Sequence, residues 1–295
     1  MSLGIDHPLV AVHDLEAAAD QARRLGFRLN PRHRHPWGTD NYLLFFPDNF
    51  IELIGIGRPE LLAYRDANGF QFGQQVADRL QLGEGIAMLA LESEDMAQDH
   101  QTLILRGARP PSPIVFRRQA HLPGGRTEEV GVSLDILHDT RAPYLTQFLC
   151  QQLRPELFRT DSSLEHHPNT AKGITAVWYV SAAPEQDTNA FRTIHGEQAV
   201  HPCEGGYCIE TEKGNIYLLT PSALATRFPL LNDIEPHPTR GVALSLACES
   251  IATAQAHWAA HDVIWQPVSR ERCDIAPAVL GGTLLCFEER SATSR

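Results

Sequence analysis

The feature that most constrains the fold is a short opening motif, a glycine followed by a β-branched residue, which occurs four times along the chain. Each copy starts an apolar stretch of strand length, and each stretch leads into a helical pattern. The four glycines, Gly4, Gly85, Gly173 and Gly241, are 81, 88 and 68 residues apart. This spacing predicts a fold built from four copies of one unit.

The first unit shows the order of its elements most plainly. A strand over residues 7–12 precedes a helix over residues 15–25, which Asp14 can cap and Gly26 can end. After the helix come three further short strands, predicted at residues 27–29, 42–46 and 50–54. The unit is therefore predicted to have the order βαβββ.

The other three units repeat this order with variations in length. Their helices are predicted to begin near Asp95, Pro184 and Ser250. The second unit is predicted to end on a strand at residues 144–149, and the fourth on a hairpin at residues 278–287. Residues 58–83, between the first two units, form a polar, turn-rich break with a few helical residues.

An isolated βαβββ unit has an open, curled sheet whose inner face needs a partner, so the units are expected to associate in pairs. We therefore predict an α+β protein in which four βαβββ modules form two domains, each with a curved mixed sheet and outer helices. The segment 153–172 contains two prolines and several charges, which is typical of a domain boundary. The domains are predicted over residues 1–155 and 165–295.

Charge and composition exclude several classes of protein. The chain has 36 acidic and 25 basic residues, and its nearest approach to a basic stripe, residues 32–35, is short. Nucleic acid is therefore not an expected partner. The sequence has no basic leader followed by an apolar run and no stretch of about 18 apolar residues, so a cytoplasmic protein without a membrane span is expected. Motifs for dinucleotide binding, phosphate binding and serine hydrolysis are absent from the sequence.

The repeat and its motifs resemble a known superfamily. The opening Gly-Ile-Asp-His of residues 4–7 and the closing Phe-Ile-Glu-Leu of residues 50–53 are similar to the vicinal oxygen chelate superfamily, which includes glyoxalases, extradiol dioxygenases and bleomycin-resistance proteins. The first half more closely resembles the glyoxalase-like domain family. The matching segments, in chain order, are residues 7–15, 25–27, 38–41, 50–53, 148–151 and 167–171.

The resemblance implies a divalent metal site in the first unit. In the superfamily a unit can contribute one ligand near the start of its first strand and a carboxylate on its last strand, and His7 and Glu52 occupy these positions. Neutral imidazole and carboxylate suit Fe, Mn, Ni or Zn. Glu52 also stands out by itself, because its period-2 neighbours Phe50 and Ile54 are apolar. The alternative is an edge strand on which Glu52 faces water.

The matching positions of the other units carry different side chains. Opposite His7 stand Met88, Ala176 and Leu244. Near the position of Glu52 stand Thr146 or Gln147, Tyr217 or Leu218, and Leu285. A catalytic metal usually has about three protein ligands, so a third ligand must come from elsewhere or be absent. Candidates for it are His35, His167 and Gln152. The second domain is expected to be a scaffold that has lost its site.

A group of polar residues is predicted to bind substrate. The group consists of His35, Asn41, Arg117, Arg118, His167 and Asn169. One of the two adjacent arginines should face inward from its predicted strand, and a planar guanidinium there would suit a carboxylate. The histidine at 167 and the asparagine at 169 lie between the predicted domains, and Asn41 lies at the predicted pocket rim. Solvated charges and ordinary turn chemistry are the alternatives for these residues.

The resemblance implies a small-molecule enzyme of the vicinal oxygen chelate type, a lyase, isomerase or dioxygenase that acts on an oxygen-bearing metabolite. The alternative is a non-catalytic protein that binds or sequesters a small molecule without metal, as bleomycin-resistance relatives do. Both the enzyme and the non-catalytic binding protein are compatible with a homodimer. The geometric prediction is that a nitrogen of His7 and a carboxylate oxygen of Glu52 lie roughly 3–4 Å apart. Their pocket should contain His35, His167 or one of the two adjacent arginines.

Overall fold

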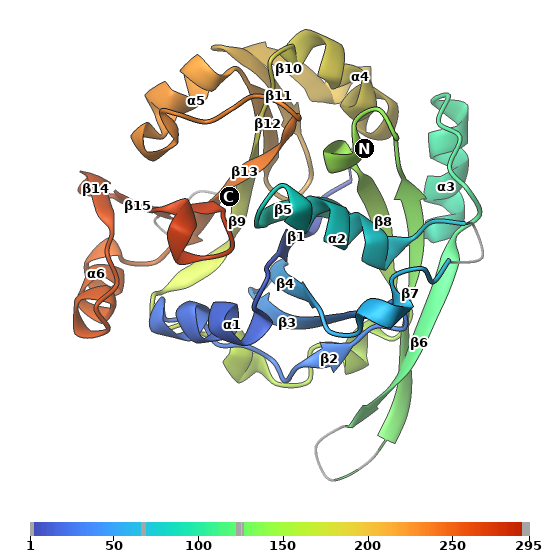
Figure 1. The fold of residues 1–295 in the computed structure, drawn as a ribbon, viewed down its shortest axis with the longest axis horizontal. Coiled ribbons are helices and arrows are strands. Elements are labelled where there is room, and N and C mark those ends of the chain that lie inside the picture. Colours follow the sequence, from blue (N-terminus) through green and yellow to red (C-terminus); the bar gives the residue numbers. More distant parts are fainter. Residues whose placement is uncertain (1–2, 66–68, 122–124, 126, 291–295) are drawn as a thin grey trace.

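The computed structural model describes residues 3–65, 69–121, 125 and 127–290, and it contains two eight-stranded mixed sheets (Figure 1). The strand order is β2-β3-β4-β1-β5-β8-β7-β6 in the first sheet and β10-β11-β12-β9-β13-β16-β15-β14 in the second. The two orders match position by position. The predicted α+β fold of four βαβββ units is therefore confirmed.

The first sheet belongs to the first two units. Its strands are β1 (Ile5–Ala11), β2 (His33–Arg34), β3 (Thr39–Phe45), β4 (Phe50–Ile56), β5 (Gly85–Glu92), β6 (Ile114–His121), β7 (Thr127–Leu137) and β8 (Gln147–Gln152). The helices of this half are α1 (Leu15–Arg24), α2 (Phe72–Gln81) and α3 (Met96–Leu105).

The second sheet belongs to the last two units. Its strands are β9 (Ala171–Val180), β10 (Val200–Cys203), β11 (Gly206–Glu210), β12 (Asn215–Leu219), β13 (Arg240–Cys248), β14 (Gln266–Ser269), β15 (Arg272–Ile275) and β16 (Leu284–Glu289). The helices of this half are α4 (Pro184–His195), α5 (Pro221–Arg227) and α6 (Ile251–Ala260). None of the helices in the described ranges has the length and apolar character needed to cross a membrane.

The helices begin where the capping chemistry predicts. Asp14 accepts hydrogen bonds from the backbone N–H groups of Glu16 and Ala17 at the start of α1. The Asp95 and Ser250 side chains do the same for α3 and α6. These side chains satisfy N–H groups that have no partner within the helix, which explains why the starts of the helices can be predicted from sequence.

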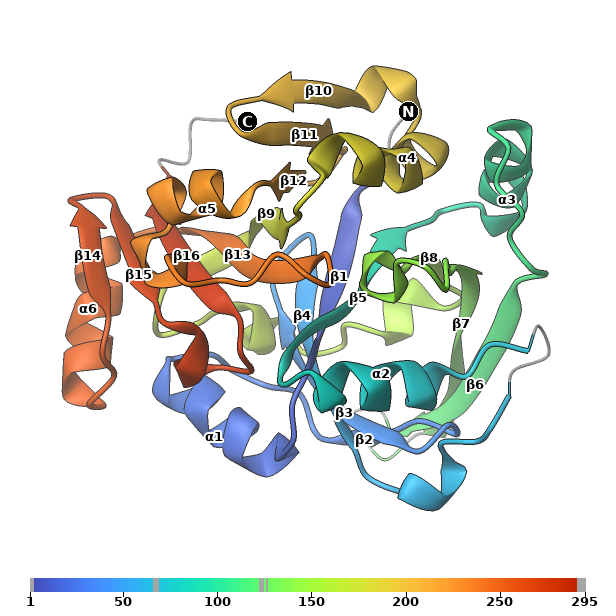
Figure 2. The ribbon, with the colours of Figure 1, turned by 45° about the horizontal axis from the view of Figure 1, so that its top comes forward.

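Two units join edge to edge in each half. β1 pairs antiparallel with β5, and β9 pairs antiparallel with β13, while the last strand of each unit runs parallel to its first strand. One apolar core continues from one sheet into the other and includes Val10, Leu53, Val177 and Leu244. Figure 2 shows the two sheets side by side with α1, α3, α4 and α6 around them. The inner, concave face of each sheet packs separately from this core.

A helix fills part of each concave face, and the sequence analysis did not foresee this. The segment 58–83, predicted as a turn-rich break, contains α2, which packs Phe72 and Val76 against the inner face of the first sheet. In the second half, α5 and the turn after it place Leu224 and Phe228 in the same way. We call the concave face of the first sheet the first cup and that of the second sheet the second cup.

Three predicted strands differ from the structure. Residues 27–29 form no strand, and a two-residue strand follows later as β2. Residues 143–145 form a 3₁₀ turn before β8, and residues 277–279 form another where a hairpin was predicted. Both turns begin with proline, which has no N–H to donate to a neighbouring strand. In these two segments the strand begins later than predicted, at Gln147 in β8 and at Leu284 in β16.

Candidate active site in the first cup

His7 and Glu52 lie side by side at the floor of the first cup. β1 and β4 are neighbouring parallel strands in which Leu9 pairs with Glu52, so the histidine two residues earlier reaches the same face. Both residues are buried, at 5% and 6% exposure. His7 Nε2 is 3.3 Å from Glu52 Oε2, within the predicted 3–4 Å. The inward orientation of Glu52 rules out the reading that it faces water on an edge strand.

Asp6 is a third member of this group. Its Oδ2 is 2.9 Å from His7 Nδ1, so one imidazole lies between two buried carboxylates. Successive strand residues normally point to opposite faces, which is why the sequence analysis assigned Asp6 no role. The β1–β5 ladder is irregular between Ile5 and His7, and such a bulge re-aims side chains locally. The only signal in the sequence is an acidic residue directly before the histidine.

The pKa values of the pair show how the charges are held. Burial lowers the pKa of His7, but Asp6 and Glu52 outweigh it and raise the pKa to about 9. Burial would raise the pKa of Glu52, whereas its hydrogen bond to His7, the nearby His35 and Asn41 together lower it. At neutral pH the site therefore holds a protonated imidazole between carboxylates.

A cavity of about 90 Å³ opens beside the pair, and two of the residues predicted to bind substrate line it. Asn41 donates from Nδ2 to Glu52 Oε1 at 2.8 Å. His35 is fixed through Nδ1 by Thr39 Oγ1 at 2.9 Å, and its Nε2 lies 3.9 Å from Glu52 Oε1. Gly38, at the turn between β2 and β3, has φ +91°, and a side chain there would collide with the Arg58 carbonyl. This turn brings His35, directly after β2, close to Asn41 on β3.

Two buried polar atoms at the cavity have no hydrogen-bond partner within the described part of the chain. They are the indole Nε1 of Trp37, a donor, and Oδ1 of Asn41, an acceptor. Most buried polar groups in proteins have a partner, so unpaired ones at a cavity are candidates for ligand contacts. The remaining wall is largely aromatic and includes Phe50, Phe72, Phe116, Phe148 and Phe158.

Comparisons with known proteins agree with this arrangement. A family model described as a glyoxalase-like domain matches residues 5–194, well over half of the chain. The chain belongs to the glyoxalase-like domain family. No curated protein matches this chain.

The fold of this glyoxalase-like protein also occurs in solved structures with low sequence identity. A hypothetical protein from Staphylococcus aureus is 15% identical, with a TM-score of 0.70 over 98% of this chain and 100% of that one. A variant of 4-hydroxymandelate synthase from Streptomyces coelicolor is 11% identical, with a TM-score of 0.60 over 100% and 94%. A fusion of a xylose isomerase-like TIM barrel with a 4-hydroxyphenylpyruvate dioxygenase is 14% identical, with a TM-score of 0.58 over 100% and 50%. These similarities place the chain in the vicinal oxygen chelate fold.

Several residues predicted to bind substrate in this glyoxalase-like protein lie away from the cavity. His167 accepts from the Arg28 N–H at 3.0 Å and donates to the Phe45 carbonyl at 2.8 Å, so it ties the connecting segment to the first sheet. Burial lowers its pKa to about 4, which keeps it neutral. Asn169 is buried and bonds to the Leu25 carbonyl.

The two adjacent arginines and Gln152 were also predicted to lie at the site. Arg117 is exposed and pairs with Glu129 at 3.0 Å, which is the solvated alternative considered above. The side chain of Arg118 lies outside the described residues. Gln152 lines the cavity, at the end of β8. His35 therefore meets the prediction that the pocket contains one further histidine or arginine, whereas His167 does not contribute to it.

The donors in this glyoxalase-like cup do not fit the divalent metal that the resemblance implies. Among the described residues, no group of three histidine, cysteine, aspartate or glutamate side chains could hold an ion. Across the cup, β5 and β8 present Met88 and Phe148, neither of which Fe, Mn, Ni or Zn favours.

Proposed function

We propose that the chain is a small-molecule enzyme of the vicinal oxygen chelate type in which the first cup catalyses proton transfer without a metal. The observation that carries the proposal is the buried group of Asp6, His7 and Glu52 beside a cavity with an unpaired donor and an unpaired acceptor. The region of residues 1–155 would be the active domain. Residues 165–295 would be a scaffold for this chemistry.

Each polar residue has a role in this mechanism. The lowered pKa of Glu52 keeps its carboxylate ionised, so it can accept a proton from a substrate carbon or hydroxyl at the cavity. The His7 imidazolium orients that carboxylate, and Asp6 holds the imidazole through Nδ1. The amide of Asn41 and the indole N–H of Trp37 can bind substrate oxygens.

The cavity restricts the substrate. A volume of about 90 Å³ admits only a small molecule, and one donor and one acceptor suit a compound with neighbouring hydroxyl and carbonyl groups. Proton transfer between carbon and oxygen is the central step of isomerisation or elimination in such compounds. Among the reaction types implied by the resemblance, the proposal therefore favours an isomerase or lyase.

Exchange of substrate protons with solvent tests the proposal. A panel of small α-hydroxyaldehydes and α-hydroxyketones would be incubated with the protein in D₂O, and deuterium uptake at carbon would be followed by NMR. We expect uptake to be catalysed by the wild type and to fall roughly 10²–10⁴-fold in Glu52→Gln, as for loss of a general base. Tyr217→Phe, at the matching position of the second cup, should retain full exchange.

Elemental analysis of the same protein, purified without chelator, distinguishes a metal-free enzyme from a metal-dependent one. We expect exchange activity without stoichiometric metal, and no loss of activity after dialysis against EDTA. Stoichiometric metal that disappears in both His7→Ala and Glu52→Ala would contradict the metal-free mechanism. Saturable binding of the panel with no exchange would instead support the non-catalytic binding protein.

A further inference from the structure

The second cup has the same backbone register as the first but different residues at the site. Ala176 pairs with Ser245 on the neighbouring central strand, as His7 pairs with Ala90. Tyr217 pairs with Trp178 just as Glu52 pairs with Leu9. The positions of the histidine and the glutamate are therefore held by alanine and tyrosine, so the second cup cannot carry out the proton transfer proposed for the first.

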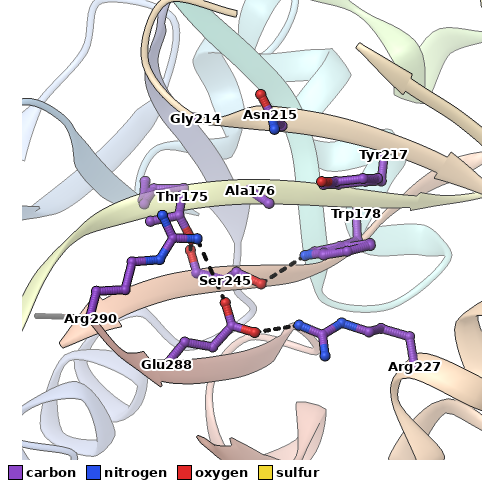
Figure 3. Close-up of a pocket in the computed structure, with 11 residues that line it drawn as sticks. Thr175, Ala176, Trp178, Gly214, Asn215, Tyr217, Arg227, Ser245, Glu288 and Arg290 are labelled. Atoms are coloured by element: carbon purple, nitrogen blue, oxygen red, sulfur yellow. Dashed lines mark hydrogen bonds and ion pairs between the residues drawn. The ribbon is translucent and has the colours of Figure 1, made fainter. Parts of the chain in front are cut away.

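These substitutions leave a larger and more polar cavity. Its volume is about 530 Å³, compared with about 90 Å³ in the first cup. Ala176 and Asn215 take the positions of His7 and Phe50, whose rings stack at a centroid distance of 4.1 Å in the first cup, and Ser245 takes the position of Ala90. Figure 3 shows Asn215, Ala176 and Ser245 on three adjacent strands, to the left of the aromatic pair Trp178 and Tyr217.

Two arginines and one glutamate converge at the side of this cavity (Figure 3). Arg227, at the end of α5, forms an ion pair with Glu288 Oε1 and lies over the Trp178 ring, 5.6 Å from its centroid. Arg290 lies 3.9 Å from Glu288 Oε2, beyond hydrogen-bond distance, and its side chain is 51% exposed. Two guanidinium groups and one carboxylate leave a net positive charge at the cavity.

Hydrogen bonds from neighbouring residues fix the positions of the groups that line this cavity. Arg272 donates to the Arg227 carbonyl at 2.8 Å and to Asp274, so it anchors the end of α5 to β15. Trp178 Nε1 donates to Ser245 Oγ at 2.9 Å, so the Ser245 O–H is the donor left for a ligand on the cavity floor. Preorganised donors of this kind reduce the entropy lost on binding.

We propose that the second cup binds a small organic carboxylate. Its carboxylate would accept hydrogen bonds from the guanidinium groups of Arg290 and Arg227, because a planar guanidinium matches the two oxygens of a carboxylate. Its body would lie over Ala176 against the edge of the aromatic pair. A cavity of this volume is in the usual range for small-molecule sites. The inference does not depend on the chemistry proposed for the first cup.

Titration calorimetry with benzoate tests the site, with neutral benzamide and inorganic phosphate as comparison probes. We expect saturable benzoate binding to the full chain below about 10 mM and much weaker binding of the other two probes. Arg290→Gln should weaken benzoate binding about tenfold or more, as for loss of a charge-assisted hydrogen bond. Because Arg290 is half exposed, this variant should fold normally.

Two further variants locate the binding. Ala176→Leu should block benzoate by filling the cavity, while thermal unfolding stays as in wild type. Glu52→Gln, in the first cup, should bind benzoate with unchanged affinity. The proposal is wrong if benzoate does not bind, if Arg290→Gln and Ala176→Leu bind it like wild type, or if affinity is lost in Glu52→Gln instead. Equal affinity for phosphate would overturn the assignment to a carboxylate.

Discussion

The two cups have the same strand order, and a helix fills part of each, yet their interiors differ. The first encloses a small aromatic cavity around buried charges, whereas the second has a wide polar cavity edged by arginines. The difference arises at a few register positions, chiefly His7 against Ala176 and Glu52 against Tyr217. The two cups thus share one backbone arrangement, and a few side chains determine which molecule each cup can bind.

The segments that fill the two cups, α2 in the first and α5 with the turn after it in the second, should contribute equally to stability. Phe72 and Phe228 are buried in the first and second cup, at 3% and 0% exposure. Replacing either by alanine leaves a cavity in a packed face and should lower the free energy of unfolding by about 3–5 kcal/mol. Urea unfolding would measure this. A large loss of unfolding free energy in only one variant would show that the two segments do not stabilise their cups equally.

Removing the His7 imidazole should destabilise the first cup, whereas the matching residue of the second cup is an alanine with no charge to lose. His7→Ala leaves Asp6 and Glu52 as neighbouring buried carboxylates without their cation, which should cost about 3–5 kcal/mol of unfolding free energy at pH 7. The matched control is His13→Ala, an exposed histidine, with an expected change within about 0.5 kcal/mol. Similar losses in both variants would contradict the charge argument.

The pH dependence of stability sharpens the same contrast. The pKa of His7 is raised from 6.5 to about 9 in the folded protein. Its contribution is therefore fully present below pH 6.5 and is lost as the pH rises through about 9. Over this interval the wild type should lose on the order of 2–3 kcal/mol more than His7→Gln. Parallel stability curves from urea unfolding at a series of pH values would show that the imidazole is not held in its charged form.

The smallest effect is expected from the ion pair of the second cup. Arg227 and Glu288 are both partly exposed, with side chains at 36% and 22%, so water screens their attraction. Arg227→Gln should cost at most about 1 kcal/mol of unfolding free energy, and added salt should reduce that cost. A loss comparable to that of His7→Ala would mean that this pair is a structural support rather than an open ligand-binding group.

The repeat and the helix caps could be predicted from the sequence because they depend on local chemistry. A cap such as Asp14 bonds to N–H groups two and three residues away, and strand alternation around Glu52 needs only its neighbours. Local pattern therefore located the four units and placed His7 and Glu52 on the first and last strands of one unit.

What surrounds that pair was decided only by the tertiary structure. Asp6 joins it through an irregularity in the β1–β5 ladder, and α2 reaches the cup from a segment with little helical signal. His167 was a candidate by sequence, but the fold places its ring between two backbone groups of the first half. Sequence periodicity determines which face a side chain takes on its own strand. Which distant groups meet there depends on how strands pair and helices pack, because those contacts join residues far apart in the chain.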